Sequence, residues 1–306
     1  MKMKFGVLLL TMFVLNALVV PGAFAQESPR PAGLGENNAK AVTPFKMFDN
    51  LYYVGLDFVC AYVIQTNDGL ILVDTLFDSF WDTTAKGMQA VGLKPGDVKY
   101  IIITHGHDDH YAGLKKFKAT YAPNARVMMT EADWALMEST LQKAGAEAVA
   151  AKGVARDMIV KDGDELKLGT TTVKMYITPG HTEGSLSLVY NVTEGGKTYQ
   201  VFNWAGPTLQ SPEIPVMEKF LASTRRIQGL AKDSQVWLHS HPWSVSFFQK
   251  YEKLKARKAG EPNPYINPSE IPVFLQGRVT DTEKRIAETK ARPAGAPQRG
   301  NRGAGN

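Results

Sequence analysis

The chain has 306 residues with 35 basic and 30 acidic side chains, a formal net charge of +5 and a single cysteine, which excludes an intrachain disulfide. The excess positive charge comes from five residues in two end segments that contain no acid: Lys2, Lys4, Arg292, Arg299 and Arg302. Residues 26–290 therefore carry no net charge, which weighs against a nucleic-acid partner.

The first 25 residues predict a secretory signal peptide. A basic start precedes an apolar stretch over residues 5–20, and Ala23-Phe24-Ala25 is typical of a cleavage site before Gln26. A membrane anchor is the alternative interpretation, but the apolar run is short for a membrane span and is interrupted at Asn16. We therefore expect a periplasmic or secreted protein that begins at Gln26 and keeps no stable membrane anchor.

Residues 26–43 are rich in Pro, Gly, Asn and Glu and are expected to form a flexible leader, followed by one domain over residues 44–290. In the first half of this domain, strands are expected over residues 51–54, 59–65, 70–73, 98–103 and 126–129. Asn67-Asp68-Gly69 predicts the hairpin turn between the second and third of these strands. Helices are expected over residues 82–91, 111–121 and 131–141.

The second half of the domain continues the mixture of strands and helices. Strands are expected over residues 158–160, 171–177, 185–190, 198–203 and 235–238. Helices are expected over residues 211–230, 245–257 and 270–290. Residues 291–306 contain almost no apolar bulk, so this tail is expected to be disordered. By itself, the pattern indicates only a fold that mixes helices and strands.

Three of the six histidines share one hexapeptide, His105-Gly106-His107-Asp108-Asp109-His110, which follows the apolar run at residues 100–103. A lone histidine is more often a polar residue satisfied by hydrogen bonds. Several imidazoles at the end of one strand are different, because they would compete for few partners at a desolvation cost. Since imidazole and carboxylate groups are zinc ligands, the cluster predicts a metal site.

The other three histidines also lie in polar turns after apolar runs. His181 lies between Pro179-Gly180 and Gly184, on a tight turn between two predicted strands, and we expect it to be a further ligand. His239 and His241 are two residues apart, so on an extended strand their side chains are expected to face the same way. The residues alone leave open which of the two binds metal.

The motif His105-x-His107-x-Asp109-His110, followed by Gly180-His181-Thr182-x-Gly184-Ser185, resembles the metallo-β-lactamase superfamily. The resemblance is closer to the third subclass of metallo-β-lactamases, whose second zinc is held without a cysteine. Residues 44–55 resemble the first strand of that branch, Ser240-His241-Pro242 its last ligand turn, and residues 263–268 the start of its final helix. The resemblance spans residues 44–290 and implies an α/β fold, a four-layer αββα sandwich.

The same resemblance implies a site with two zinc ions per chain. The first zinc would be held by His105, His107 and His181, and the second by Asp109, His110 and His241. His241 is favoured over His239 because the family's ligand lies directly before a proline. Asp109 would also be catalytic, by orienting the attacking hydroxide. Asp74 ends a buried strand nearby, and we expect it to be a hydrogen-bond acceptor beside the site or a turn cap rather than a ligand.

The implied function is a secreted zinc hydrolase of small molecules, a β-lactamase that confers antibiotic resistance. Many hydrolases of the superfamily have a metal-bridging aspartate after the strand pair that follows His181, but residues 201–206 contain no carboxylate. This disfavours glyoxalase and persulfide-dioxygenase activity. A lactonase or another carboxylic-ester hydrolase is the alternative, and a non-catalytic zinc-binding protein is less favoured. The chain departs from the branch at Glu183, where a proline is usual, and at Trp204, where a small polar residue is usual.

Overall fold

The computed structural model describes residues 35–292. The predicted signal peptide, the start of the predicted leader and all but the first two residues of the predicted tail lie outside this range. Within the leader, a 3-10 turn covers Glu36–Asn38 and Ala39 is buried. The backbone N–H of Lys40 donates to the Asp57 carboxylate at 2.8 Å. Residues 35–43 therefore pack on the domain.

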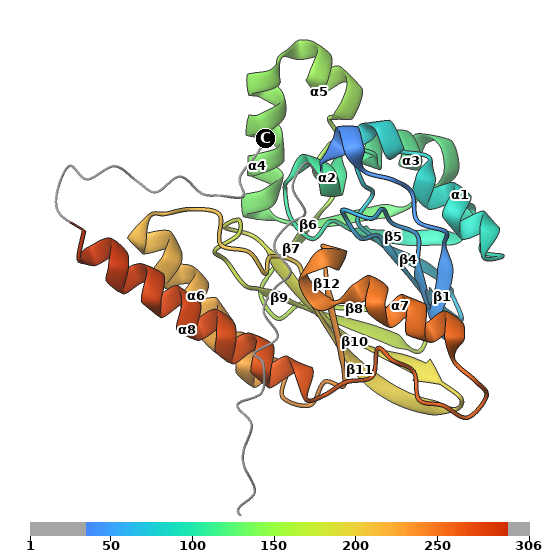
Figure 1. The fold of residues 1–306 in the computed structure, drawn as a ribbon. Coiled ribbons are helices and arrows are strands. Elements are labelled where there is room, and N and C mark those ends of the chain that lie inside the picture. The colour runs from blue at the N-terminus through green and yellow to red at the C-terminus, as the bar shows by residue number, and fades with distance from the viewer. Residues whose placement is uncertain (1–34, 293–306) are drawn as a thin grey trace, which may run out of the picture.

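Two β-sheets form the centre of the molecule (Figure 1). The first sheet has seven strands that neighbour one another in sequence order: β1 (Phe45–Phe48), β2 (Leu51–Tyr53), β3 (Tyr62–Thr66), β4 (Gly69–Val73), β5 (Val98–Ile102), β6 (Arg126–Thr130) and β7 (Met158–Val160). Strands β1 to β4 pair antiparallel, whereas β4 to β7 pair parallel. The carboxyl ends of β4, β5 and β6 therefore meet at one edge of this sheet.

The second sheet has five strands in the order β12-β11-β10-β9-β8: β8 (Glu165–Leu168), β9 (Thr171–Ile177), β10 (Leu186–Glu194), β11 (Lys197–Trp204) and β12 (Val236–His239). Only the β11–β12 pair is parallel among its described strands. The two sheets pack face to face, because inward residues such as Ile71, Met175 and Phe202 belong to one buried cluster. Val73 joins this cluster, while its neighbour Leu72 faces the opposite side of the sheet.

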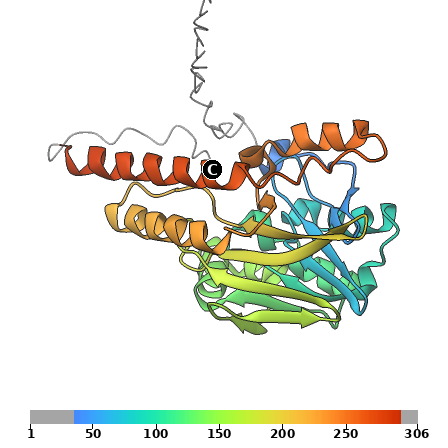
Figure 2. The same ribbon diagram turned by 90° about the horizontal axis from the view of Figure 1, so that it is seen from below.

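Helices cover both outer faces of the two sheets. The outer face of the first sheet packs on α1 (Thr83–Ala90), α3 (Leu114–Tyr121) and α4 (Glu131–Ala144) through Met88, Phe117 and Trp134. The second sheet packs on α6 (Ile214–Leu230) and α8 (Glu270–Lys290), which lie side by side in Figure 2. The expected αββα sandwich is confirmed. Three further helices complete the described chain: α2 (Asp108–Tyr111), α5 (Ala146–Lys152) and α7 (Phe247–Ala256).

Several predicted elements have different bounds in the structure. The helix predicted over 111–121 begins only at Leu114, as α3, and is separated from the preceding α2 at Gly113, where a Cβ would lie 2.3 Å from the carbonyl oxygen of Thr75. The helix predicted over 245–257 is interrupted by Ser246, which adopts a left-handed conformation. The strand predicted from residue 59 begins only at Tyr62. Each difference comes from tertiary contacts or backbone geometry that local periodicity does not encode.

Helix α5 and strand β8 were not predicted. Gly145, at φ 103°, ends α4 and begins the separate α5, whose Ala-rich sequence has high helix propensity. The alternation of Glu165-Leu166-Lys167-Leu168 is the signal that predicts β8 in retrospect. Over residues 35–292, no helix is long and apolar enough to cross a membrane.

Candidate metal centre

The hexapeptide that contains three histidines lies at the carboxyl end of β5. After Ile102 the chain leaves the sheet, and α2 begins at Asp108, directly after His107. The neighbouring strand β4 ends beside it at Val73, directly before Asp74. The turn that contains His181 connects β9 to β10, and His241 follows β12, so both come from the second sheet. Ligands from the two sheets therefore converge at one end of the sandwich.

The first group of candidate ligands consists of His105, His107 and His181. The Nε2 atom of His181 lies 3.2 Å from Nε2 of His105 and 3.2 Å from Nδ1 of His107. Three tetrahedral zinc ligands at about 2.0–2.1 Å from the metal lie about 3.3 Å from one another. Both distances from His181 therefore match the spacing of neighbouring ligands in a zinc tetrahedron, and the three ligand atoms all lie within 4.8 Å of one another.

The second group consists of Asp109, His110 and His241. The carboxylate oxygen Oδ2 of Asp109 lies 3.4 Å from Nε2 of His110 and 3.7 Å from Nε2 of His241. The Nε2 atom of His110 is buried and makes no hydrogen bond within the described residues. A buried ring nitrogen without a donor is expected where a metal takes its lone pair. This donor set fits a second divalent cation.

Outer partners orient the ligand rings of both groups. The Nδ1 atom of His181 donates to the carbonyl oxygen of Thr208, and Nδ1 of His241 donates to that of Phe58, each at 2.8 Å. Since a carbonyl can only accept, each Nδ1 carries the proton and each Nε2 presents its lone pair to the centre.

Asp74 connects the two groups through hydrogen bonds. Its Oδ2 accepts from Nδ1 of His110 at 2.8 Å and from the Thr104 hydroxyl at 2.8 Å. That hydroxyl in turn accepts from Nδ1 of His105 at 3.3 Å. Asp74 has a φ of 63°, a left-handed conformation that aspartate tolerates better than most residues. The carboxylate thus supports one ligand of each group and belongs to neither group.

Burial and neighbouring charges set the protonation of the ligands. Burial lowers the pKa of His181 to about 3 and that of His241 to about 4, and it also lowers the pKa of His105 and His107. Burial lowers the pKa of His110 too, but the carboxylates of Asp109 and Asp74 outweigh it and raise that pKa to about 10. Four of the five imidazoles are therefore neutral near pH 7 without a metal, and His110 is protonated.

His239 does not face the same way as His241, so that expectation is wrong. Strand β12 ends at His239, and the backbone bends at Ser240, whose hydroxyl donates to the carbonyl of Ala205. The ring of His239 packs among Trp204, Trp237 and Phe274, with ring centroids 4.9–6.1 Å away. The two side chains point in different directions because the strand ends at His239 and the chain bends before His241.

The end of β11 contributes no carboxylate to the centre. Trp204 is fully buried and stacks on Phe220 of α6, so it does not occupy the site. Gly206 lies against the ligand turn, where a Cβ would come within 2.6 Å of the His181 Cβ. Glu183 is exposed and pairs with Lys219 of α6 at 2.6 Å. Within the described chain, the two ligand groups share no residue.

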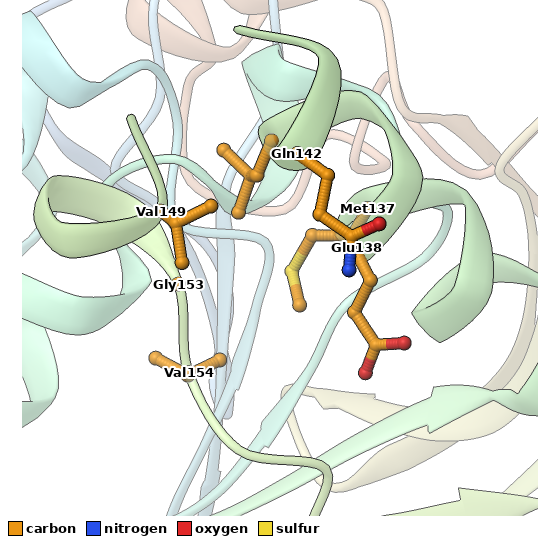
Figure 3. Close-up of a pocket in the computed structure, with 7 residues that line it drawn as sticks. Met137, Glu138, Gln142, Val149, Gly153 and Val154 are labelled. Carbon is orange, nitrogen blue, oxygen red and sulfur yellow. The ribbon is translucent and has the colours of Figure 1, made fainter. Parts of the chain in front are cut away.

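Sequence reasoning missed several residues that hold the ligands. Phe58 and Thr208 lie in segments without a metal motif, Thr104 directly precedes the hexapeptide, and Asp133 of α4 is buried beside the ligand turns. A groove of about 240 Å³ between α4 and α5 contains none of the six candidate ligands (Figure 3). Its lining includes Met137, Leu141 and Val149, so it is a mainly apolar surface feature away from the ligand turns.

Comparisons with known proteins agree with this geometry. A family model described as the metallo-beta-lactamase superfamily matches residues 54–194. A subclass B3 metallo-beta-lactamase of Bradyrhizobium japonicum, BJP-1, is 29% identical, with a TM-score of 0.69 over 82% of this chain and 96% of that one. The FEZ-1 metallo-beta-lactamase from Legionella gormanii is 23% identical, with a TM-score of 0.73 over 83% of this chain and 98% of that one, and it supports the fold alone.

Another similar protein is named for a different activity. A hydroxyacylglutathione hydrolase of Francisella tularensis subsp. novicida (strain U112) is 27% identical over 222 residues, which cover 68% of this chain and 78% of the relative.

Proposed function

This chain is a member of the metallo-β-lactamase superfamily, and on that premise we propose that it is a dizinc hydrolase that opens the amide bond of a β-lactam ring. The observation that carries the proposal is the ligand arrangement. Two groups of three ligands lie together, without a cysteine and without a carboxylate shared between them. Three ligands per zinc leave a coordination position open for catalysis.

The residues of this chain have separate roles in the proposed reaction. Two bound divalent cations would supply the activation of water near neutral pH and the polarisation of a scissile carbonyl. His105, His107 and His181 would hold the first cation, and the second group would hold the other. Asp109, about one-seventh exposed, would accept a hydrogen bond from the attacking water and orient it. Asp74 would keep His110 and, through Thr104, His105 in orientation.

A thioester or ester hydrolase is the second candidate function. The similarity to a hydroxyacylglutathione hydrolase favours this candidate, and hydrolysis of a thioester, like that of a β-lactam, begins with attack on a carbonyl carbon. The end of β11 argues against this candidate, because that segment contributes no metal-bridging carboxylate. Lactones belong to the same alternative.

A substrate panel distinguishes these functions. The zinc-loaded protein is tested against a chromogenic cephalosporin, a penicillin, a carbapenem, an acyl lactone, an aryl ester and a hydroxyacylglutathione. The proposal predicts chelator-sensitive turnover of at least one β-lactam, with the highest kcat/KM of the panel. Chelator-sensitive turnover of the esters or the thioester alone would establish the second candidate. No turnover of any panel member would support a non-catalytic zinc-binding protein.

We also propose that the protein is exported and cleaved before Gln26. The proposal rests on the basic start, the apolar stretch and the Ala23-Phe24-Ala25 site. The intact mass of the protein recovered from periplasm and medium tests it. A mass that includes residues 1–25 would instead support a membrane anchor.

Removal of the tail after residue 290 is expected to leave zinc content and turnover unchanged.

A further inference from the structure

The start of α4 lies between the two turns that provide the first ligand group. Gly106 separates His105 from His107, and a Cβ on it would lie 2.7 Å from the carbonyl oxygen of Asp133. Gly184 follows the His181 turn, and a Cβ on it would lie 1.9 Å from the Thr130 hydroxyl and 3.0 Å from Cγ of Asp133. Each turn therefore contacts the start of α4 at a glycine, where no side chain separates the two backbones.

Hydrogen bonds connect the start of α4 to the His181 turn. Thr130 caps the helix by accepting from the backbone N–H of Asp133 at 3.4 Å, and its hydroxyl donates to the carbonyl of Gly184 at 3.0 Å. The carboxylate of Asp133 accepts from the Thr182 hydroxyl at 3.0 Å. Thr182 is next to the ligand His181 and also contacts the Ser185 hydroxyl at 2.7 Å.

Asp133 is buried in an unusual way for a carboxylate. It is 1% exposed, and within residues 35–292 it forms no ion pair with lysine or arginine. Its Oδ2 accepts a hydrogen bond from the Thr182 hydroxyl, while Oδ1 forms no hydrogen bond within the described residues. Burial raises the pKa of the carboxyl to about 7, although the Thr182 hydroxyl and the backbone N–H groups of Gly106 and Gly184 act to lower it. A buried carboxylate is costly unless its partners compensate. Here all of these partners belong to the turns that contain metal ligands.

We propose that Asp133 is a positioning residue that fixes the turn of His105 and His107 relative to the turn of His181. The two turns come from different sheets and are more than seventy residues apart in sequence. One backbone hydrogen bond, from the N–H of Leu186 to the carbonyl of Thr104 at 2.9 Å, joins the segments beside them. Asp133 contacts the turns themselves, because its backbone carbonyl lies against Gly106 and its carboxylate accepts from the Thr182 hydroxyl. The inference rests on the proposed metal centre but on no particular substrate.

The second ligand group does not depend on this contact in the same way. Asp109 and His110 come from one helix, α2, and His241 is held by the carbonyl oxygen of Phe58. Weakening the contact between Asp133 and the ligand turns should therefore lower zinc affinity mainly in the first group. Outer partners of metal ligands change metal affinity by about 10–100-fold when they are removed.

The first test compares Thr182→Val with Thr182→Ser in the full-length protein. Valine has the shape of threonine and serine is smaller by one methyl group, but only serine keeps the hydroxyl that donates to Asp133. Zinc dissociation constants are measured by competition with a chromophoric chelator, and the absorption spectrum of the cobalt-substituted protein is recorded. In the valine variant we expect the dissociation constant of one zinc to rise about tenfold or more, and in the serine variant we expect it to stay near that of the original protein. Equal affinities in both variants and the original protein would overturn the proposal.

The second test compares Asp133→Asn with Asp157→Asn. Asp157 also accepts a backbone N–H, that of Val127 at 2.8 Å, but it lies at the opposite end of β6. We expect Asp133→Asn to weaken one zinc site and alter the cobalt spectrum, while Asp157→Asn leaves both unchanged. Equal zinc binding in the two variants would contradict the proposal. If Asp133→Asn fails to fold, the threonine pair decides the question. Because the readout is metal affinity, a protein that hydrolyses no β-lactam would refute the proposed function and leave this inference standing.

Discussion

His110 is the residue whose protonation differs most from that of the other ligands. Its Nδ1 donates to Asp74 and its Nε2 faces Asp109, so two carboxylates act on one buried ring. Their charges outweigh burial and raise the pKa of His110 to about 10. A metal requires the neutral ring, so binding must remove this proton.

Zinc binding should therefore release a proton from His110. His181 and His241 have pKa values of about 3 and about 4, so they are already neutral near pH 7 and release none. The raised pKa of His110 means that apparent zinc affinity rises with pH, by about tenfold per unit from pH 7 towards pH 10. Calorimetry in two buffers of different ionisation enthalpy measures the released proton. Asp74→Asn should reduce the release at pH 8, and an unchanged release would contradict the account of His110.

The two neighbouring histidines near the end of β12 should differ in zinc content. His241→Ala removes a ligand of the second group, so the zinc content should fall from about two per chain towards one. His239→Ala should keep about two, although the cavity among Trp204, Trp237 and Phe274 should cost about 2–5 kcal/mol of stability. Zinc is counted by elemental analysis after gel filtration. The reverse outcome would reassign the ligand.

At the scale of elements, the ligand turns depend on close backbone approach to helices. The His181 turn lies between α4 and α6. Gly180, at φ 132°, lies so close to α6 that a Cβ would come within 2.6 Å of Phe220. The Ser223 hydroxyl of α6 donates to the carbonyl oxygen of Pro179 at 2.7 Å. A side chain at Gly180 or Gly184 would therefore have to displace the adjacent helix or the turn itself.

Two glycine substitutions should therefore have opposite effects. Gly184→Ala forces the turn away from Thr130 and Asp133, so it should lower zinc content and reduce activity at least tenfold. Gly277→Ala lies within α8, where nothing is within 4 Å of the added methyl, and it should stabilise the protein by about 0.5–1 kcal/mol. Urea unfolding and zinc analysis of both variants provide the check. A Gly184→Ala protein with normal zinc content would show that the turn can relax.

The sequence predicts the ligand side chains better than the residues that hold them. His105, His107 and His110 are adjacent in sequence, and a Pro-Gly turn marks His181, so local pattern is enough to find them. The local pattern does not predict the roles of Asp133 and Phe58, because their contacts with the ligand turns arise only when the two sheets pack. The same reason explains His239, whose direction depends on a bend that no alternation pattern reveals.

Helix bounds show the same division. Residues 270–290 form α8 as predicted, because its period and flanking turn residues are local signals. The split at Gly113 comes from the approach of Thr75 on another segment. Local chemistry therefore predicts most elements, and tertiary contacts decide where they break.

At the scale of the whole molecule, each ligand group spans both sheets. His105 and His107 follow β5 of the first sheet, whereas His181 lies between two strands of the second. Asp109 and His110 lie in α2, which follows the same strand of the first sheet, and His241 follows β12 of the second. A bound metal would therefore connect the two halves of the sandwich at the end where the turns meet.

Metal should consequently raise the stability of the whole fold. A ligand that binds only the folded state at 100 times its Kd contributes about 2.7 kcal/mol per site. We expect a chelator to lower the Tm by several degrees and added zinc to restore it. The His241→Ala variant should show a smaller response because one site is incomplete. A Tm that does not respond to chelation would contradict a metal centre that spans the two sheets.

The central claim is that two zinc ions bind in two separate ligand groups. Anomalous diffraction from zinc-loaded crystals, recorded on both sides of the zinc absorption edge, tests it directly. The account predicts two peaks per chain, one at about 2.0–2.1 Å from nitrogens of His105, His107 and His181 and the other bound by Asp109, His110 and His241. A single peak, or a peak bound by His239, would contradict it.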